Sequence, residues 1–171
     1  MRLALLAVGR LRPYYRAACD DYLRRLGRYL TVTETEVREA ARAPSPEAQR
    51  EEEAERLRAK IPAGATTVAL AREGRGWSSV ELARVVEQWR VTGRPVAVLI
   101  GGSHGLAPEL IAAAGARWSL GPLTLPHELA RVVVTEQLYR AMTIVRGEPY
   151  HKGIESPGSK AEPSARRHPS S

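Results

Sequence analysis

The chain has 171 residues, a length that suits one domain with a sizeable buried core. Hydrophobic residues make up 43% of it and charged residues 26%, which excludes a disordered, collagen-like or coiled-coil chain. The 26 lysines and arginines outnumber the 19 acidic residues, and the net charge of +7 favours a polyanionic partner, although a basic solvated surface would carry the same charge.

Strand and helix patterns alternate along the first third of the chain. Leu3 to Val8 is a continuous apolar run, typical of a strand buried on both faces of a parallel sheet. An amphipathic helix follows from Pro13 to Leu26, with Cys19 on its apolar side. Residues 30–37 predict a less apolar strand, nearer an edge. Residues 45–60 predict a helix opened by a serine cap and a proline, with its five glutamates on a solvated face.

The alternation continues towards the C-terminus. We expect a strand over 66–71, a glycine-broken loop over 72–77, and a helix opened by the capping-box spacing of Ser78 and Glu81 and ended by Gly93. The remaining expected elements are a buried strand over 96–100, a short helix over 108–116, a brief strand over 118–120 and a long helix over 128–146. This long helix is apolar on two sides, so it could cover the sheet on one side and a second copy of the chain on the other.

The two ends of the chain bound its organisation. Residues 153–171 are rich in Ser, Pro and basic residues, so we expect a disordered tail after a single domain spanning 1–152. Cys19 is the single cysteine, which excludes an intrachain disulfide and fits a reducing cytoplasm. The sequence has no secretory signal pattern and no long apolar run, so we expect no membrane span.

This order of elements predicts an α/β fold with a parallel sheet, in which ligands bind beyond the carboxyl ends of the strands. Three loops qualify: the one after Leu70, residues 101–105 and residues 121–127. The Gly101-Gly102-x-x-Gly105 loop lets backbone approach a ligand, but a plain tight turn would use the same residues. It matches neither the dinucleotide fingerprint nor a phosphate loop. The apolar 123–127 loop (LTLPH) either packs under another segment or lines a slot for a planar group such as adenine.

Several stretches together resemble the bacterial large-subunit rRNA pseudouridine N3-methyltransferases, the RlmH family of the SPOUT superfamily. They are MRLALLAVGR, YLRRL, LIGGSHGL, WSLGPLTLPHELARVVVTEQLYRA and PYHK, and the resemblance covers residues 1–152. It implies a three-layer SPOUT fold with a C-terminal trefoil knot, a homodimer, and S-adenosyl-L-methionine (S-adenosylmethionine) held in the knotted loops. The cofactor-binding residues it implies are Leu70, Ala71, Gly102, Gly121, Pro122, Leu123, Thr124, Leu125 and Pro126.

The chemistry implied by the resemblance is methyl transfer to N3 of a pseudouridine, without a metal. N3 must lose its proton to a side chain or a water. We expect the terminal triplet of the family match to form the substrate side: His151 could accept this proton or hydrogen-bond the base, Tyr150 could stack on the base, and Lys152 could hold a phosphate. Without the resemblance, the triplet would be three exposed polar residues near a frayed terminus.

A second group of residues has two interpretations. Glu136 and Arg140 lie one helical turn apart and either pair with each other or, as in the family, lie near the site. His127 either caps the long helix or takes part in catalysis. Arg10 and Arg12 follow the first strand and either contact RNA or are simply solvated.

The resemblance therefore implies a cytoplasmic rRNA methyltransferase acting on the 23S rRNA of the large subunit or assembled ribosome. This small chain has no separate RNA-binding domain, so the particle's shape would guide recognition. The alternatives are methylation of tRNA by the same fold, and a nonenzymatic RNA-binding or ribosome-assembly factor. A nucleotide-binding module of flavodoxin-like topology is a further alternative, but the sequence has no phosphate-loop signature to support it. Residues 153–171 extend past the position where members of the family usually end. This tail could shield the site, bind RNA or have no role at the site.

Overall fold

Five parallel strands form one sheet in a computed structural model that describes residues 1–151. The strands are β1 (Arg2–Val8), β2 (Thr31–Val37), β3 (Thr66–Arg75), β4 (Val96–Ile100) and β5 (Ala116–Trp118). The helices are α1 (Pro13–Leu26), α2 (Pro46–Arg58), α3 (Ser79–Thr92), α4 (Pro108–Ala113), α5 (His127–Val145) and the 3-10 helix η1 (Pro149–His151). The strand order is β2-β1-β4-β3-β5. This confirms the expected α/β class with a parallel sheet.

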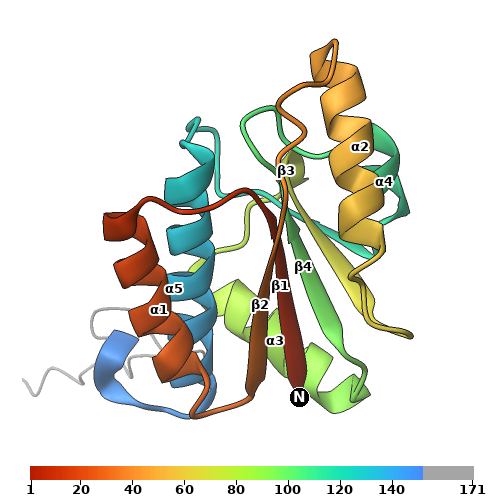
Figure 1. Ribbon diagram of the computed structural model, residues 1–171. Helices are drawn as coiled ribbons and strands as arrows, with labels where there is room; N and C mark the ends of the chain where they lie inside the picture. Colours follow the sequence, from red (N-terminus) through yellow and green to blue (C-terminus); the bar gives the residue numbers. More distant parts are fainter. Residues whose placement is uncertain (152–171) are drawn as a thin grey trace, which may run out of the picture.

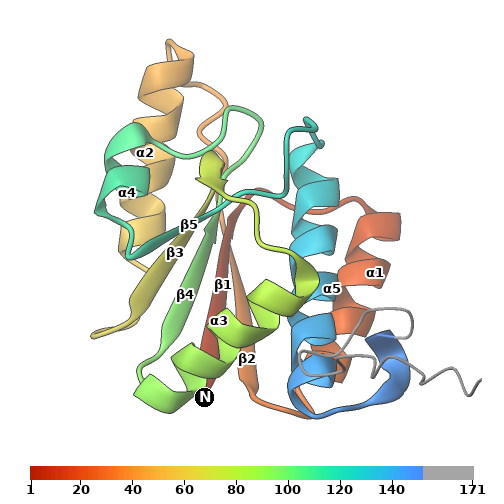
Figure 2. The ribbon, with the colours of Figure 1, turned by 180° about the vertical axis from the view of Figure 1, so that it is seen from behind.

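The helices cover both faces of the sheet, giving three layers. α1, α3 and α5 lie on one face and α2 and α4 on the other (Figures 1 and 2). β1 shows why: Leu3, Leu5 and Ala7 belong to the first core, whereas Leu6 and Val8 belong to the second. Successive side chains of a strand point to opposite faces, so an uninterrupted apolar run needs cover on both.

Local signals in the sequence set several helix ends. The Ser45 hydroxyl accepts a hydrogen bond from the Ala48 amide at 3.1 Å, which begins α2. Ser78 and Glu81 form the reciprocal capping box of α3, and Gly93 ends that helix with a φ of 71°. These caps confirm the expected boundaries, and β2 is an edge strand as its composition indicated.

The loop expected over 72–77 is wrong over residues 72–75, because β3 continues to Arg75. A Cβ on Gly74 would lie 2.7 Å from the backbone nitrogen of Trp118, so this glycine admits the close approach of β5. The Ser119 amide then donates to the Arg75 carbonyl at 2.9 Å. The glycine that suggested a break instead permits strand contact.

Two short elements also differ from expectation. α4 ends at Ala113, and β5 occupies 116–118 rather than 118–120. Ala114 is already extended, and Ala116 pairs with Val68 of β3. Pairing with β3 therefore ends the helix early and begins the strand two residues sooner than the apolar pattern indicated.

The solvated face expected for the five glutamates of α2 is wrong at Glu53, which is only 2% exposed. The other four are exposed. Glu53 lies on the same side of α2 as Ala54 and Leu57, which pack against the sheet. The high charge of the helix concealed this inward position.

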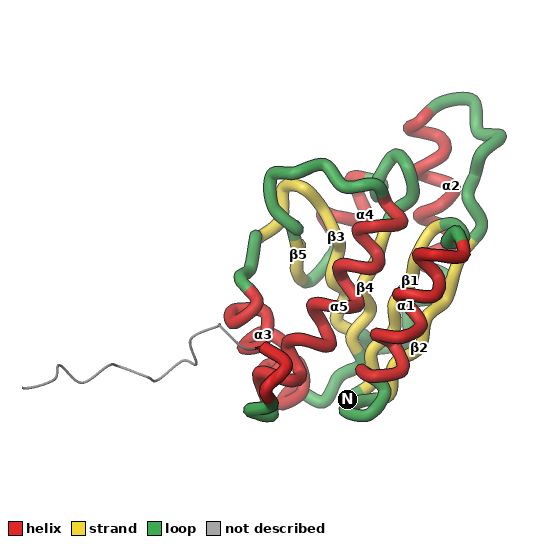
Figure 3. The backbone as a smooth tube through the Cα atoms, turned by 90° about the vertical axis from the view of Figure 1, so that its left-hand side faces the viewer, coloured by secondary structure: helices red, strands yellow, loops and turns green. Residues whose placement is uncertain are grey.

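The long helix α5 packs between α1 and α3, as the tube view shows (Figure 3). Val134, Leu138 and Met142 are buried against the sheet, whereas other apolar residues of α5 remain half-exposed. No helix within residues 1–151 is long and apolar enough to cross a bilayer. Lys152 and the expected tail, 153–171, lie outside the described residues.

Candidate functional site

A pocket of about 710 Å³ opens beyond the carboxyl ends of β4 and β5, beside the middle of β3. Its walls come from residues 70–72 of β3, the loop after β4, the loop after β5 and the first turn of α5. All three segments expected to bind a ligand contribute, although the segment after Leu70 is strand rather than the expected loop. The lining is mainly aliphatic and glycine, with Arg72, His104 and His127 adding polar groups.

The loop after β4 needs its glycines for shape. A Cβ on Gly101 would lie 2.4 Å from the Gly105 carbonyl carbon, so a side chain at 101 would stop the loop from folding back on itself. Gly105 has a φ of 74°, and its amide donates to the Gly102 carbonyl at 3.0 Å. Gly102 is buried and lines the pocket. The loop is thus a tight turn that also presents backbone to a ligand.

The loop after β5 is held by local contacts and leaves apolar groups open. Gly121 has a φ of 106°, a conformation that side chains disfavour, and its amide donates to the Ser119 hydroxyl at 3.1 Å. Leu123 is 75% exposed while lining the pocket, and Leu125 is half-buried. For Leu123, packing under another segment is therefore wrong within residues 1–151, and an apolar slot agrees with its position.

The structure gathers almost all residues expected at the cofactor site. Eight of the nine line the pocket: Leu70, Ala71, Gly102, Gly121, Leu123, Thr124, Leu125 and Pro126. Pro122 is in the same loop but is not part of the lining. Ten further lining residues are not among the expected cofactor contacts: Arg72, Ile100, Gly101, Ser103, His104, Gly105, Ser119, Leu120, His127 and Ala130.

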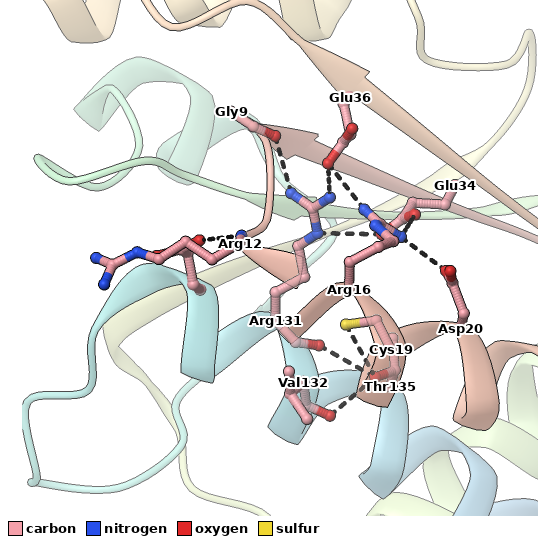
Figure 4. Close-up of polar contacts among 11 residues, drawn as sticks. Gly9, Arg12, Arg16, Cys19, Asp20, Glu34, Glu36, Arg131, Val132 and Thr135 are labelled. Atoms are coloured by element: carbon pink, nitrogen blue, oxygen red, sulfur yellow. Dashed lines mark hydrogen bonds and ion pairs between the residues drawn. The ribbon is translucent and has the colours of Figure 1, made fainter. Parts of the chain in front are cut away.

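A buried arginine holds the first turns of α5 against the neighbouring strands. Arg131 has a side chain only 3% exposed. Its Nε pairs with Glu34 at 3.0 Å, one terminal nitrogen pairs with Glu36, and the other donates to the Gly9 carbonyl at 3.0 Å (Figure 4). Arg16 of α1 contacts the same two carboxylates. This network fixes the end of β1, β2 and α1 to the helix that begins at the pocket.

A second contact fixes the segment between β1 and α1. The Arg12 amide donates to Glu128 at 2.7 Å, and the Arg12 Nε pairs with the same carboxylate at 3.0 Å. The Arg12 side chain is still 68% exposed, and Arg10 is exposed too. Sequence patterns missed the positioning role of Arg12 and Arg131. For Arg131, the available signal was the pair of acidic residues, Glu34 and Glu36, on one face of an edge strand.

The second half of α5 carries a separate polar cluster. Arg140 donates to Glu136 at 2.7 and 3.0 Å, which confirms the predicted pairing of these two residues. The Tyr150 hydroxyl donates to the same Glu136 oxygen at 3.0 Å, and the Arg140 guanidinium lies 4.9 Å from the centre of the Tyr150 ring. The Tyr150 ring also meets Tyr139 edge-on at 4.6 Å. Burial, and then the Glu136 charge, raise the pKa of Tyr150.

The pocket and this cluster lie at different levels of α5. Ala130 lines the pocket, whereas Arg140 lies ten residues further along the helix, about 15 Å at the usual rise per residue. Figure 1 shows η1 beside the end of α5 that is remote from the pocket loops. The structure therefore does not bring Tyr150 into the pocket of its own chain. His151 ends η1, and Lys152 lies outside the described residues.

His127 is the first residue of α5 and lines the pocket, but it is not the helix cap. The N-cap position belongs to Pro126, which has no side-chain hydrogen bond to the helix. The capping interpretation of His127 is therefore wrong, because Pro126 occupies the N-cap position and His127 is already the first residue of the helix. Residues 1–151 contain no cluster of three or more His, Cys, Asp and Glu side chains able to hold a metal.

Comparisons with known proteins agree with one another. The family model described as "Predicted SPOUT methyltransferase" matches residues 1–151. A protein of Rubrobacter xylanophilus named ribosomal RNA large subunit methyltransferase H is 54% identical over 155 residues, covering 88% of this chain and 98% of that protein. A namesake from Pseudomonas paraeruginosa is 42% identical over 155 residues, covering 89% of this chain and all of that protein.

A solved structure supports the fold. The crystal structure of a "Probable Methyltransferase" from Bordetella pertussis Tohama I has a TM-score of 0.52 to this chain. It covers 82% of this chain and 96% of the other, at 16% sequence identity. At that identity, the likeness concerns the arrangement of the backbone.

Proposed function

Because this chain belongs to the SPOUT methyltransferase family, we propose that it transfers a methyl group from S-adenosylmethionine to N3 of a pseudouridine in large-subunit ribosomal RNA. Within the family it groups with ribosomal RNA large subunit methyltransferase H. The observation that carries the proposal is that eight of the nine expected cofactor residues line one pocket of about 710 Å³. We also propose the family's trefoil knot around the 119–126 loop, and a cytoplasmic location beside the ribosomes.

The residues of the pocket fit this cofactor better than they fit a phosphorylated nucleotide. The volume lies in the usual range for small-molecule sites. Leu70, Leu120 and Leu125 offer apolar surface to an adenine ring, and the loop backbone offers hydrogen bonds to its edge. The glycine loop lacks a phosphate-loop lysine, and the buried Glu53 carboxylate lies behind it. These features disfavour a dinucleotide or triphosphate.

The reaction needs an electrophile, an aligned nucleophile and a proton acceptor. When bound, S-adenosylmethionine supplies the methyl carbon, whose bond to sulfur breaks as N3 forms its new bond. His151 accepts the N3 proton in our proposal, and Lys152 holds a phosphate of the RNA. The contacts of Tyr150 with Glu136 and Arg140 support a positioning task, because they fasten η1, which carries His151, to α5.

The site is completed by a second copy of the chain in this proposal. In one chain, Arg140 lies about 15 Å along α5 from the pocket-lining Ala130. A homodimer that pairs the α5 helices would place the polar cluster of Glu136, Arg140 and Tyr150 of one chain at the pocket of the other. The face of α5 available for this contact is half-exposed and mixes apolar with charged side chains: Leu129, Val132, Val133, Glu136 and Arg140.

Mixing two inactive variants tests the shared site. Ala71→Trp enlarges a side chain that lines the pocket, and Glu136→Ala removes the carboxylate shared by Arg140 and Tyr150, so each homodimer should be inactive. Random mixing makes half of the dimers mixed, each with one intact composite site, so we expect about a quarter of wild-type activity. Activity that stays at the level of the two variants alone would contradict a site shared between chains.

Methyl incorporation from labelled cofactor tests the substrate. We expect incorporation into large subunits taken from cells that lack this protein, and none into bulk tRNA. Incorporation into tRNA instead would favour the tRNA alternative, and the absence of saturable S-adenosylmethionine binding by calorimetry would favour a nonenzymatic RNA-binding factor. His151→Ala should abolish transfer while leaving cofactor affinity nearly unchanged, with His168→Ala as the matched control.

A further inference from the structure

Glu53 is a buried carboxylate without a full set of partners. It is 2% exposed, and its Oε1 atom accepts one hydrogen bond of 3.3 Å from the Ala40 amide. Its Oε2 atom is buried and has no hydrogen-bond partner within residues 1–151. A carboxylate removed from water is costly unless a cation or hydrogen-bond donors compensate it. The position of Glu53 therefore needs an explanation other than stability.

Arg50 does not supply the missing charge. It lies one turn earlier on α2, with its side chain 25% exposed, and its ion pair is with Glu47 at 3.9 Å. Among the described residues, no lysine, arginine or histidine nitrogen lies within 4.0 Å of the Glu53 carboxylate. Within residues 1–151, the Glu53 carboxylate therefore has no cation to compensate its charge.

The carboxylate lies directly against the wall of the pocket. A Cβ on Gly102 would lie 3.6 Å from the Glu53 Oε2 and 3.0 Å from the Val8 Cγ1. Gly102 also lines the pocket. Because Gly102 has no side chain, only its backbone separates the Glu53 carboxylate from a ligand bound at the glycine loop. The low polarity around Val8 and Gly102 strengthens the electrostatic effect of that charge on the pocket.

We propose that Glu53 makes the pocket prefer the positively charged methyl donor over its neutral demethylated product. This inference rests on the proposed function. Methyl transfer converts a sulfonium into an uncharged thioether, while the rest of the cofactor keeps its charges. A fixed negative charge beside the pocket therefore favours the donor and weakens binding of the product, which helps the product to leave. Glu53 is a specificity-determining residue that acts through space rather than by contact with the reacting atoms.

Calorimetry with three ligands tests this selectivity. The ligands are S-adenosylmethionine, its product S-adenosylhomocysteine, and sinefungin, in which a protonated amine replaces the methyl sulfonium. Glu53→Gln keeps the shape and the acceptor for Ala40 but removes the charge. A unit charge within about 10 Å in a partly desolvated site is worth about tenfold in affinity. We therefore expect about tenfold weaker binding of the two cationic ligands, and less than twofold change for the product.

Two matched variants control the experiment. Glu55→Gln removes one charge from the exposed face of the same helix and should leave all three affinities unchanged. Glu53→Asp keeps the charge and should preserve most of the preference. If Glu53→Gln does not fold, Glu53→Met replaces it, because exchanging an unpartnered buried carboxylate for an apolar isostere is expected to preserve stability.

The outcomes separate this inference from the proposed function. Equal weakening of all three ligands, or no change in any of them, would overturn the role of Glu53 and leave the methyltransferase assignment standing. If the wild-type protein binds none of the three, the proposed function fails and the inference fails with it. A selective loss for the two cationic ligands supports both.

Discussion

Replacing Arg131 with methionine is the sharpest perturbation of the scaffold beneath the pocket. The wild-type guanidinium makes two ion pairs, with Glu34 and Glu36, and one hydrogen bond to the Gly9 carbonyl, while only 3% exposed. Arg131→Met removes all three contacts and leaves two carboxylates facing each other. Breaking a buried pair by deleting one partner costs about 3 to 5 kcal/mol.

The remaining contacts decide where in this range the variant falls. Arg16 still pairs with Glu34 at 2.5 Å and with Glu36 at 2.9 Å, so neither carboxylate is left without a cation. Glu36 is also 31% exposed and regains some hydration. We therefore expect a loss of about 3 kcal/mol in the free energy of unfolding, near the lower limit.

Urea unfolding followed by tryptophan fluorescence measures this loss. Arg12→Met is the matched control: the Arg12 side chain is 68% exposed, and the buried Glu128 keeps its hydrogen bond from the Arg12 amide, so we expect a loss of at most about 1 kcal/mol. Adding Glu36→Gln to Arg131→Met should recover part of the loss, since it removes one of the two repelling charges. A loss below about 1 kcal/mol for Arg131→Met would refute the view that this network fastens α5 to the sheet.

Three further outcomes test the loops, caps and tyrosines. Gly121→Ala forces a Cβ onto a residue with a φ of 106°, so we expect about fivefold weaker S-adenosylmethionine binding by calorimetry, and unchanged affinity would contradict it. Ser78→Ala removes the capping box with Glu81 and should lower the free energy of unfolding by about 1 kcal/mol in urea, whereas an unchanged midpoint would count against the cap. Burial and the hydrogen bond to Glu148 raise the pKa of Tyr29 to about 12, above its unfolded value near 10. The contribution of the protonated Tyr29 hydroxyl to the free energy of unfolding is then complete below about pH 10 and is lost as the pH rises towards 12. Between these pH values, the free energy of unfolding should fall less steeply in Tyr29→Phe than in the wild-type protein. Equal slopes of the free energy of unfolding against pH in the two proteins would refute the pKa assignment.

Elements with strong local signals were predictable from the sequence. The run from Leu3 to Val8 and the caps at Ser45 and Ser78 predict their elements because each signal is local in the chain. Gly74 shows the limit of this reasoning. A glycine predicts a break unless another strand passes close to it, and the approach of Trp118 depends on tertiary structure.

The same distinction holds for the site. The position of ligand-binding segments at the carboxyl edge follows from a parallel sheet, and the pocket contains residues from all three segments expected there, although the first is part of β3 rather than a loop. The burial of Glu53 could not be predicted, because a helix rich in glutamate looks solvated throughout. The distance between Tyr150 and the pocket was equally hidden, since residues near in a family motif need not meet within one chain.

Mass spectrometry of ribosomal RNA tests the central claim most directly. Large-subunit RNA from cells that lack this protein would be compared with RNA from the parent strain and from cells complemented with the wild-type chain or with His151→Ala. We expect one pseudouridine to lose its N3 methyl group in the deletion strain, and the wild-type chain alone to restore it. If the large-subunit RNA of the deletion strain carried the same methyl groups on its pseudouridines as the parent RNA, the proposed activity would be contradicted.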